Sequence, residues 1–175
     1  MSNLKLVCID PLHCEFLRKY EKRVSYNSNQ KKTRPFVGIL FTIDFYDFFA
    51  PLSSPKKKHL KMKNKIDFYK IDGGKLGAVN FNNMIPVSKD NYKIVDLNKN
   101  KNSLTKEDQK YQELLKDQLA WLNKNQQQIR KKASKLYYLY KNNRLNPNIR
   151  SRCCNFLLLQ EKCEKYPKGI DNFTK

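Results

Sequence analysis

The chain has 175 residues, which fits one domain of ordinary size and excludes two independent catalytic domains. Hydrophobic residues make up 39% and aromatic residues 12%, so a packed core is expected and wholesale disorder is excluded. Lys and Arg total 36 against 16 Asp and Glu, a formal net charge of +20 at pH 7. Such a charge repels itself in a compact fold, so the expected partner is a polyanion, and nucleic acid first of all.

The base composition of the genome explains part of this charge. The chain has 19 Asn, and 29 of its 36 basic residues are Lys, a bias typical of an A/T-rich genome. That bias adds Lys and Asn but does not remove acids, which are absent from long stretches of the chain. The charge pattern therefore favours polyanion binding.

Two features indicate the cellular compartment. The first ten residues contain a short apolar, strand-like run that is followed at once by an acid and Pro11, unlike a signal peptide, and no 18-residue apolar run follows. We therefore expect a cytoplasmic protein without a membrane partner. The cysteines form an odd set without CxxC spacing, which favours packed, reduced thiols over disulfides or a zinc site. They are Cys8, Cys14, Cys153, Cys154 and Cys163.

The first elements alternate between strand and helix signals. Asp10 followed by Pro11 is typical of a helix start. The strongest β signal is a β-branched and aromatic run that can turn at residues 44–47. The expected elements are a strand over residues 4–9, a helix over 12–24, a polar loop over 25–33, and a hairpin of 36–43 with 48–52.

The next part of the chain begins with a strongly basic segment. Residues 56–65 contain six Lys and one His and no acid, which predicts a cationic loop. Further strands are expected over residues 66–71, 76–81 and 92–97, with a tight turn at residues 72–74 and a break at Pro86. Five to seven short strands joined by hairpin turns predict a small closed or half-open β-barrel.

After residue 97 the apolar period changes from two to 3.6, which predicts helices. Thr105, with Asp108 three residues on, resembles a helix cap, and Asn155 caps a short last helix. The fold class is therefore α+β. We expect a single domain over residues 1–175 that is β-rich over 1–97, helical over 103–165 and loose over 166–175.

The helical part carries a second basic region. Residues 118–160 contain nine positive charges and no acid. A solvated helix face would explain this pattern, and so would a face that follows a phosphate backbone. The second basic region at residues 56–65 favours the phosphate interpretation.

The residue types restrict the possible chemistry. The chain has two histidines, His13 and His59, without clustered acids beside them, so a metal nuclease is not favoured. The nucleotide-binding and hydrolase motifs GxxxxGK[ST], GxGxxG and GxSxG are missing, and no cofactor is expected. RNA cleavage stays open because RNA carries its own nucleophile, the 2′-OH. The enzyme must then align the phosphate, move two protons and stabilise the transition-state charge.

One short tract has side chains suited to that task. Residues 53–59, SSPKKKH, place two hydroxyls, a proline and several cations at a predicted strand end. A strand-end turn with solvated lysines would give the same sequence, and on composition alone that interpretation is favoured. His59 by itself is typical of a loop histidine.

With its neighbours, this tract resembles the ToxN/AbiQ family of type III toxin-antitoxin ribonucleases. The similarity continues through the helix at residues 111–122 and covers nearly the whole chain. Its most specific part is APLSSPK at residues 50–56. The other matching motifs are RPFVG at 34–38, LGAVNF at 76–81, MIP at 84–86, and CNF at 154–156 with the leucines that follow.

The resemblance implies a metal-independent endoribonuclease on a compact MazF/Kid-like (SH3-like) barrel elaborated with helices. It also implies cleavage of cellular or phage RNA to leave a 2′,3′-cyclic phosphate. A repeated pseudoknot antitoxin RNA, which the enzyme would also process, would inhibit the enzyme and assemble with it into a closed toxin-RNA oligomer. The A/T-rich composition fits a low-GC Gram-positive host, so the expected branch of the family is that of AbiQ, in which such proteins act in abortive phage infection.

The resemblance also implies the catalytic residues. Lys56 would stabilise the transition-state phosphate or protonate the leaving oxygen, Ser54 would position the phosphate, and Ser53 would assist. Arg34 stands where the family commonly has Lys and could clamp a phosphate, but it is permanently charged and cannot act as a base. Gln30 stands where the family tends to have Tyr, so the general base stays open between a lysine and a tyrosine.

Residues expected to contact RNA lie in both basic regions and near the predicted strands. The expected RNA-binding residues are Lys31, Lys32, Lys57, Lys58, His59, Lys61, Asn80, Asn82, Lys124, Arg130 and Lys131.

Two rival functions stay open. One is a non-catalytic RNA-binding module. The other, more weakly, is a DNA-binding regulator, although the chain has no helix-turn-helix signature.

Overall fold

The computed structural model describes residues 2–25, 35–98 and 101–166. Its strands are β1 (Lys5–Ile9), β2 (Phe36–Gly38), β3 (Thr42–Ile43), β4 (Tyr46–Ser53), β5 (Tyr69–Lys70), β6 (Ala78–Val79), β7 (Ile85–Val87) and β8 (Tyr92–Ile94). Its α-helices are α1 (Pro11–Arg18), α2 (Lys57–Lys61), α3 (Lys106–Lys124), α4 (Gln126–Lys141), α5 (Pro147–Arg150) and α6 (Phe156–Glu164). Short 3₁₀ turns cover Asp72–Gly74, Phe81–Asn83, Lys89–Asn91 and Lys101–Ser103.

Strand β4 is the centre of the sheet. The antiparallel order is β5-β6-β4-β2-β1-β8, and β3 and β7 also pair with β4. The first half of β4 pairs with β3 and β7, and its second half pairs with β2 and β6. Every residue of β4 before Ser53 is buried, which explains why this aromatic run is apolar on both faces.

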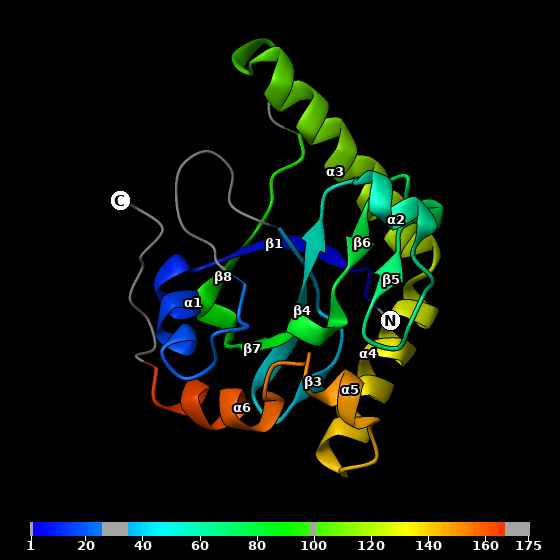
Figure 1. Ribbon diagram of the computed structural model, residues 1–175. Helices are drawn as coiled ribbons and strands as arrows, with labels where there is room; N and C mark the ends of the chain where they lie inside the picture. The colour runs from blue at the N-terminus through cyan, green and yellow to red at the C-terminus, as the bar shows by residue number, and fades with distance from the viewer. Residues whose placement is uncertain (1, 26–34, 99–100, 167–175) are drawn as a thin grey trace.

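The sheet is open over the described residues, so the predicted small barrel is not confirmed, nor is its MazF/Kid-like form. The two ends of the strand order, β5 and β8, do not pair with each other, and Figure 1 shows them on different sides of the molecule. Strands β5 and β6 have only two residues each, too short to continue the sheet around a closed barrel. Helices cover the sheet instead. The α+β class is confirmed.

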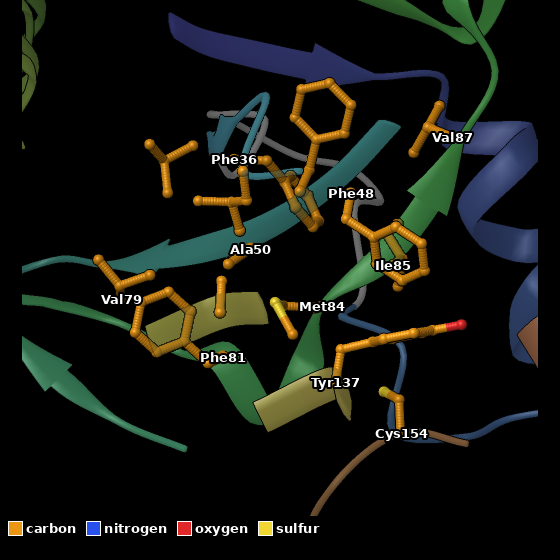
Figure 2. Packing of buried hydrophobic residues seen from close by; sticks show 14 of the residues in the cluster. Phe36, Phe48, Ala50, Val79, Phe81, Met84, Ile85, Val87, Tyr137 and Cys154 are labelled. Carbon is orange, nitrogen blue, oxygen red and sulfur yellow. The ribbon is translucent and has the colours of Figure 1, made fainter. Parts of the chain in front are cut away.

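Helices pack on the sheet from two sides. In Figure 1, α3 and α4 run along one side, with the first turns of α3 projecting beyond the body, while α1 and α6 lie on the other. Figure 2 shows the core between them, where Phe48 and Met84 lie near Tyr137 of α4. Phe48, Met84 and Phe156 of α6 are fully buried. Burial of such side chains supplies most of the stabilisation of a fold of this kind.

Several predicted elements are confirmed with their caps. The Asp10 carboxylate accepts from the Leu12 N–H at 2.9 Å, the Thr105 hydroxyl from the Asp108 N–H at 3.1 Å, and the Asn155 side chain caps α6. The first helix is shorter than predicted. It ends at Arg18. The guanidinium of Arg18 donates a hydrogen bond to the carbonyl oxygen of Val24, with an Nη1 to O distance of 2.5 Å, and so closes the turn that follows.

Two elements differ from the sequence prediction. The segment predicted as a cationic loop contains the helix α2, because His59 is 2% exposed and anchors one face of it. A strand, β7, replaces the break predicted at Pro86, which lies opposite Phe48 of β4. The predicted loose tail lies outside the described residues except for Tyr166, whose hydroxyl donates 3.0 Å to the Asp10 carboxylate.

Four of the five cysteines, Cys14, Cys153, Cys154 and Cys163, are buried, and Cys8 is half-buried. Burial raises the pKa of Cys153 and of Cys154 to about 12. None of the described helices combines the length and the apolar composition that a membrane span requires. Over the same residues, no three His, Cys, Asp or Glu side chains gather as metal ligands would.

Candidate active-site cleft

A cleft of about 330 Å³ lies where β4 ends and α2 begins. Figure 1 shows α2 beside β5 and β6 at one edge of the sheet. The cleft is therefore built by segments that are far apart in the chain. Its lining residues are Ser53, Lys56, Lys58, His59, Met62, Lys65, Asp67, Phe68, Asn80, Asn82 and Arg152.

The end of β4 is fixed by its neighbour β6. Ser53 pairs with Ala78, and Gly77 precedes that pair with φ +100°. A Cβ on Gly77 would lie 2.0 Å from the carbonyl oxygen of Ser53, so only glycine allows the two backbones to approach this closely. The close approach fixes the position of the Ser53 side chain at the rim of the cleft.

Asn80 orients the Ser53 hydroxyl. The amide Nδ2 of Asn80 donates to Oγ of Ser53 at 2.7 Å and to the carbonyl of Pro51 at 3.3 Å. Because the Ser53 oxygen accepts this bond, its own hydrogen stays available to a group in the cleft. The pair thus presents a hydroxyl donor next to the cations of α2.

Lys56 stands immediately before α2 in an extended conformation, with φ −140° and ψ 145°. Its carbonyl accepts the N–H of His59 at 2.8 Å, which closes the first turn, while its side chain is exposed to the cleft. Lys58 and Lys65 add two more ammonium groups to the same lining. Three lysines around one cleft create a strongly positive potential there.

His59 is a buried wall residue and not the loop histidine that the sequence predicted. Burial, followed by the positive charges of Lys58 and Lys56, lowers the pKa of His59, so the ring is neutral at pH 7. Its Nδ1 is buried without a hydrogen-bond partner among the described residues, and its ring lies 5.8 Å from that of Phe68. A neutral, packed imidazole adds shape to the cleft but no charge.

The lining of the cleft also includes an ion pair. Arg152 donates from Nε at 3.1 Å and from Nη2 at 2.8 Å to the same carboxylate oxygen of Asp67. The Asp67 side chain is 5% exposed and that of Arg152 is 45% exposed. Asn82 donates 3.3 Å to the carbonyl of Arg152 and so joins this part of the lining to the sheet side.

The structure brings together six of the residues predicted from the sequence: Ser53, Lys56, Lys58, His59, Asn80 and Asn82. Ser54, Lys57 and Lys61 are exposed next to this cleft but do not line it. Lys124 and Lys131 lie exposed on α3 and α4, away from it. Lys31, Lys32 and Arg34 lie outside the described residues.

Arg130, which the sequence predicted to bind RNA, forms hydrogen bonds within the protein. Its guanidinium donates to the carbonyls of Ile39, of Leu40 at 3.3 Å and of Ser2 at 2.8 Å. Burial lowers the pKa of Arg130. These bonds tie α4 to the turn after β2 and to the start of the chain, which is a structural role.

Sequence reasoning missed five lining residues. Lys65 belongs to the acid-free run and could have been included on that signal. Asp67, Phe68 and Arg152 come from segments whose proximity no local pattern indicates. Met62 completes the set as an apolar contact.

Four cations against one carboxylate, with a hydroxyl and two amides beside them, suit an anion that offers several oxygens. The fold and this cleft therefore define a small basic α+β protein whose cleft suits a phosphodiester. Residues 5–164 match the family described as the toxin ToxN of type III toxin-antitoxin systems, and the chain belongs to that family.

Two curated relatives match almost the whole chain. The endoribonuclease ToxN of Bacillus thuringiensis subsp. kurstaki is 29% identical over 169 residues, covering 94% of this chain and 85% of that protein. The endoribonuclease AbiQ of Lactococcus lactis subsp. lactis is 27% identical over 180 residues, covering 94% and 90%. The resemblance seen in the sequence motifs is thus confirmed.

Solved structures agree in fold. One, from work on a processed non-coding RNA that regulates a bacterial antiviral system, superposes with a TM-score of 0.77 at 26% identity, covering 94% of this chain and 99% of that one. Another, from work on selective toxin inhibition by a non-coding RNA pseudoknot in type III systems, has a TM-score of 0.75 at 27% identity, covering 94% and 98%.

Proposed function

We propose that this protein is the endoribonuclease toxin of a type III toxin-antitoxin system and cuts RNA at the cleft between β4 and α2. The observation that carries the proposal is the meeting of the Ser53 hydroxyl and the Lys56 ammonium in one cationic cleft. The relatives named endoribonuclease ToxN and AbiQ support the activity.

The cleavage step needs only groups that the cleft and the RNA supply. The 2′-OH loses its proton, its oxygen attacks the neighbouring phosphorus, and the P–O5′ bond breaks as the leaving oxygen gains a proton. The products are a 2′,3′-cyclic phosphate and a 5′-hydroxyl end. Lys56 stabilises the negative charge that develops on the phosphate or protonates the leaving oxygen.

The serines position the phosphate. The Ser53 oxygen accepts a hydrogen bond from Asn80 at 2.7 Å, so its own hydroxyl hydrogen can be donated to a phosphate oxygen. Ser54, exposed one residue further on, contributes a second hydroxyl to the same phosphate. Arg34 clamps the phosphate as a further cation. The general base is a lysine or a tyrosine.

The protein acts in the cytoplasm, and its RNA partners are of two kinds. The substrate is cellular or phage RNA, held by the exposed lysines around the cleft. The inhibitor is a repeated pseudoknot RNA that occupies the same cationic surface and joins toxin copies into a closed assembly. The relative whose structure concerns inhibition by a pseudoknot RNA supports this partner.

A cleavage assay in EDTA tests the proposed activity. Purified protein is incubated with a defined single-stranded RNA and excess EDTA, and both new ends are mapped. We expect discrete cuts that end in 2′,3′-cyclic phosphate and 5′-hydroxyl. Intact RNA that nevertheless binds tightly would refute the proposal and favour a non-catalytic RNA-binding module.

A further inference from the structure

The guanidinium of Arg152 is held in a defined orientation at the cleft. Nε and one Nη2 hydrogen both point to Oδ2 of Asp67, at 3.1 and 2.8 Å. Because the guanidinium is planar and has five N–H donors, these two bonds fix its plane and leave three donors. These three remaining N–H donors of Arg152 form no hydrogen bond within the described residues.

The main chain around Arg152 is fixed as well. The Cys154 N–H donates 2.8 Å to the carbonyl of Asn82, and Arg23 donates 2.8 Å to the carbonyl of Ser151. The Arg23 guanidinium also pairs with Glu21 at 3.0 Å. The segment that carries Arg152 is therefore anchored to the floor of the cleft and to the segment after α1.

The ion pair itself is costly in this position. Asp67 is almost completely buried, and its second oxygen, Oδ1, has no hydrogen-bond partner among the described residues. Burying a carboxylate costs several kcal/mol, and such a pair is often no more stabilising than apolar residues of similar size. A pair of this kind is better explained by the orientation it gives to Arg152 than by stability.

The position of Arg152 suits a phosphate. It lines the same cleft as Lys56 and Ser53, and its side chain is 45% exposed there. A planar guanidinium gives two parallel hydrogen bonds to a phosphate, which a lysine cannot do. Arg152 would thus neutralise the phosphate together with Lys56.

Resting on the proposed function, we propose that Arg152 binds a non-bridging oxygen of the scissile phosphate, and that Asp67 is the positioning residue that directs it there. The interaction strengthens as negative charge develops on the phosphate. Its loss therefore lowers the rate of the chemical step more than it lowers the affinity for RNA.

The test measures single-turnover cleavage at saturating RNA in EDTA. Arg152→Ala is expected to lower the rate about 100-fold, as the loss of one donor to a developing oxyanion does. Arg152→Lys is expected to cut at about a tenth of the wild-type rate, since Lys keeps the positive charge but lacks the forked donors of the guanidinium. Asp67→Asn, which keeps the acceptor oxygen, is expected to lower the rate about 10-fold with little change in RNA affinity.

The matched control is Arg144→Ala, which removes an equal charge at an exposed position outside the cleft and is expected to change the rate by less than about two-fold. The double variant Asp67→Asn with Arg152→Ala leaves no unpaired buried charge, so it is expected to fold. Because it also lacks the Arg152 guanidinium, it is expected to cut RNA as slowly as Arg152→Ala.

The outcomes separate the two proposals. A wild-type protein that does not cut RNA refutes the proposed function. If wild type cuts RNA and Arg152→Ala or the folded double variant cuts it as fast as Arg144→Ala, only the role of Arg152 is refuted. The same conclusion follows if the rate at saturation is unchanged and only RNA affinity falls.

Discussion

Asn80 holds the hydroxyl of Ser53 through a hydrogen bond of 2.7 Å, and the two residues come from different segments of the edge of the sheet that borders the cleft. The bond fixes which atom of the hydroxyl faces the cleft. The orientation of the Ser53 hydroxyl at the cleft therefore depends on both segments together.

Asn80→Ala is expected to lower the cleavage rate about 10-fold, because a lost hydrogen bond of about 1.4 kcal/mol frees the Ser53 hydroxyl to rotate. Single-turnover rates of Asn80→Ala, Ser53→Ala and the double variant measure this. If Asn80 acts through Ser53, the double variant is no slower than Ser53→Ala. Losses that multiply would contradict the coupling.

Gly77→Ala is expected to destabilise the protein by about 3 kcal/mol, because the residue is held at positive φ and its new Cβ would meet the Ser53 carbonyl at 2.0 Å. Urea unfolding measures the change. Gly73→Ala is the control, since Gly73 also has positive φ, +62°, but a methyl group there would have no atom within 4 Å. It is expected to cost about 1 kcal/mol. Equal costs at the two positions would contradict the close approach.

Arg130→Ala is expected to lower the free energy of unfolding by about 2 kcal/mol, since it leaves the carbonyls of Ile39, Leu40 and Ser2 without their charged donor. Lys131→Ala, on the exposed neighbouring position, is expected to leave stability within about 0.5 kcal/mol. Denaturant titrations compare the two. A stable Arg130→Ala protein with weakened RNA binding would contradict the structural role and support the RNA-binding role predicted from the sequence.

Acid is expected to destabilise the fold through His13. Burial lowers the pKa of His13 to about 4, against weaker raising effects of the Pro86 carbonyl and Asp10; Cys163 and Tyr166 also contact the ring. Between pH 6.5 and 4 the unfolded chain binds the extra proton, so stability falls as pH falls.

From pH 7 to pH 5 this single group is expected to remove about 2 kcal/mol from the free energy of unfolding. Urea unfolding at the two pH values measures the loss, and His13→Gln, which cannot titrate, is the control. The variant should lose about 2 kcal/mol less than wild type over the same interval. Equal losses would show that His13 is not the group responsible.

Much of the fold was predictable because its signals are local. The run before and after Asp44 is β-branched and aromatic, and the oxygen-bearing side chains of Asp10, Thr105 and Asn155 mark helix starts. Strand β7 was not predictable, because Pro86 is typical of a break and is accommodated only by its tertiary partners.

Helix α2 was missed for a similar reason. Its sequence offers no side-chain cap and a run of like charges, both unfavourable for an isolated helix. The helix is held by packing, since His59 is buried and Gly74 lies so close that a Cβ there would be 2.7 Å from the His59 carbonyl oxygen. Packing of this kind has no signature within a short window.

The candidate site also has a part that was predictable from a local motif and a part that was not. Ser53, Lys56 and Lys58 lie within one short tract, so one motif located them, whereas Asp67 and Arg152 are 85 residues apart and meet only in the fold. The small barrel, predicted as closed or half-open, is not confirmed, because short strands and hairpin turns also suit an open sheet.

The most direct test of the site is the cleavage rate of Lys56→Ala compared with Lys63→Ala. Both substitutions remove one exposed lysine from the same basic segment, but only Lys56 lines the cleft. In a single-turnover assay with EDTA, Lys56→Ala is expected to cut RNA at least about 100-fold more slowly than wild type, and Lys63→Ala within about two-fold of it. Equal rates for the two folded variants would contradict the assignment of catalysis to this cleft.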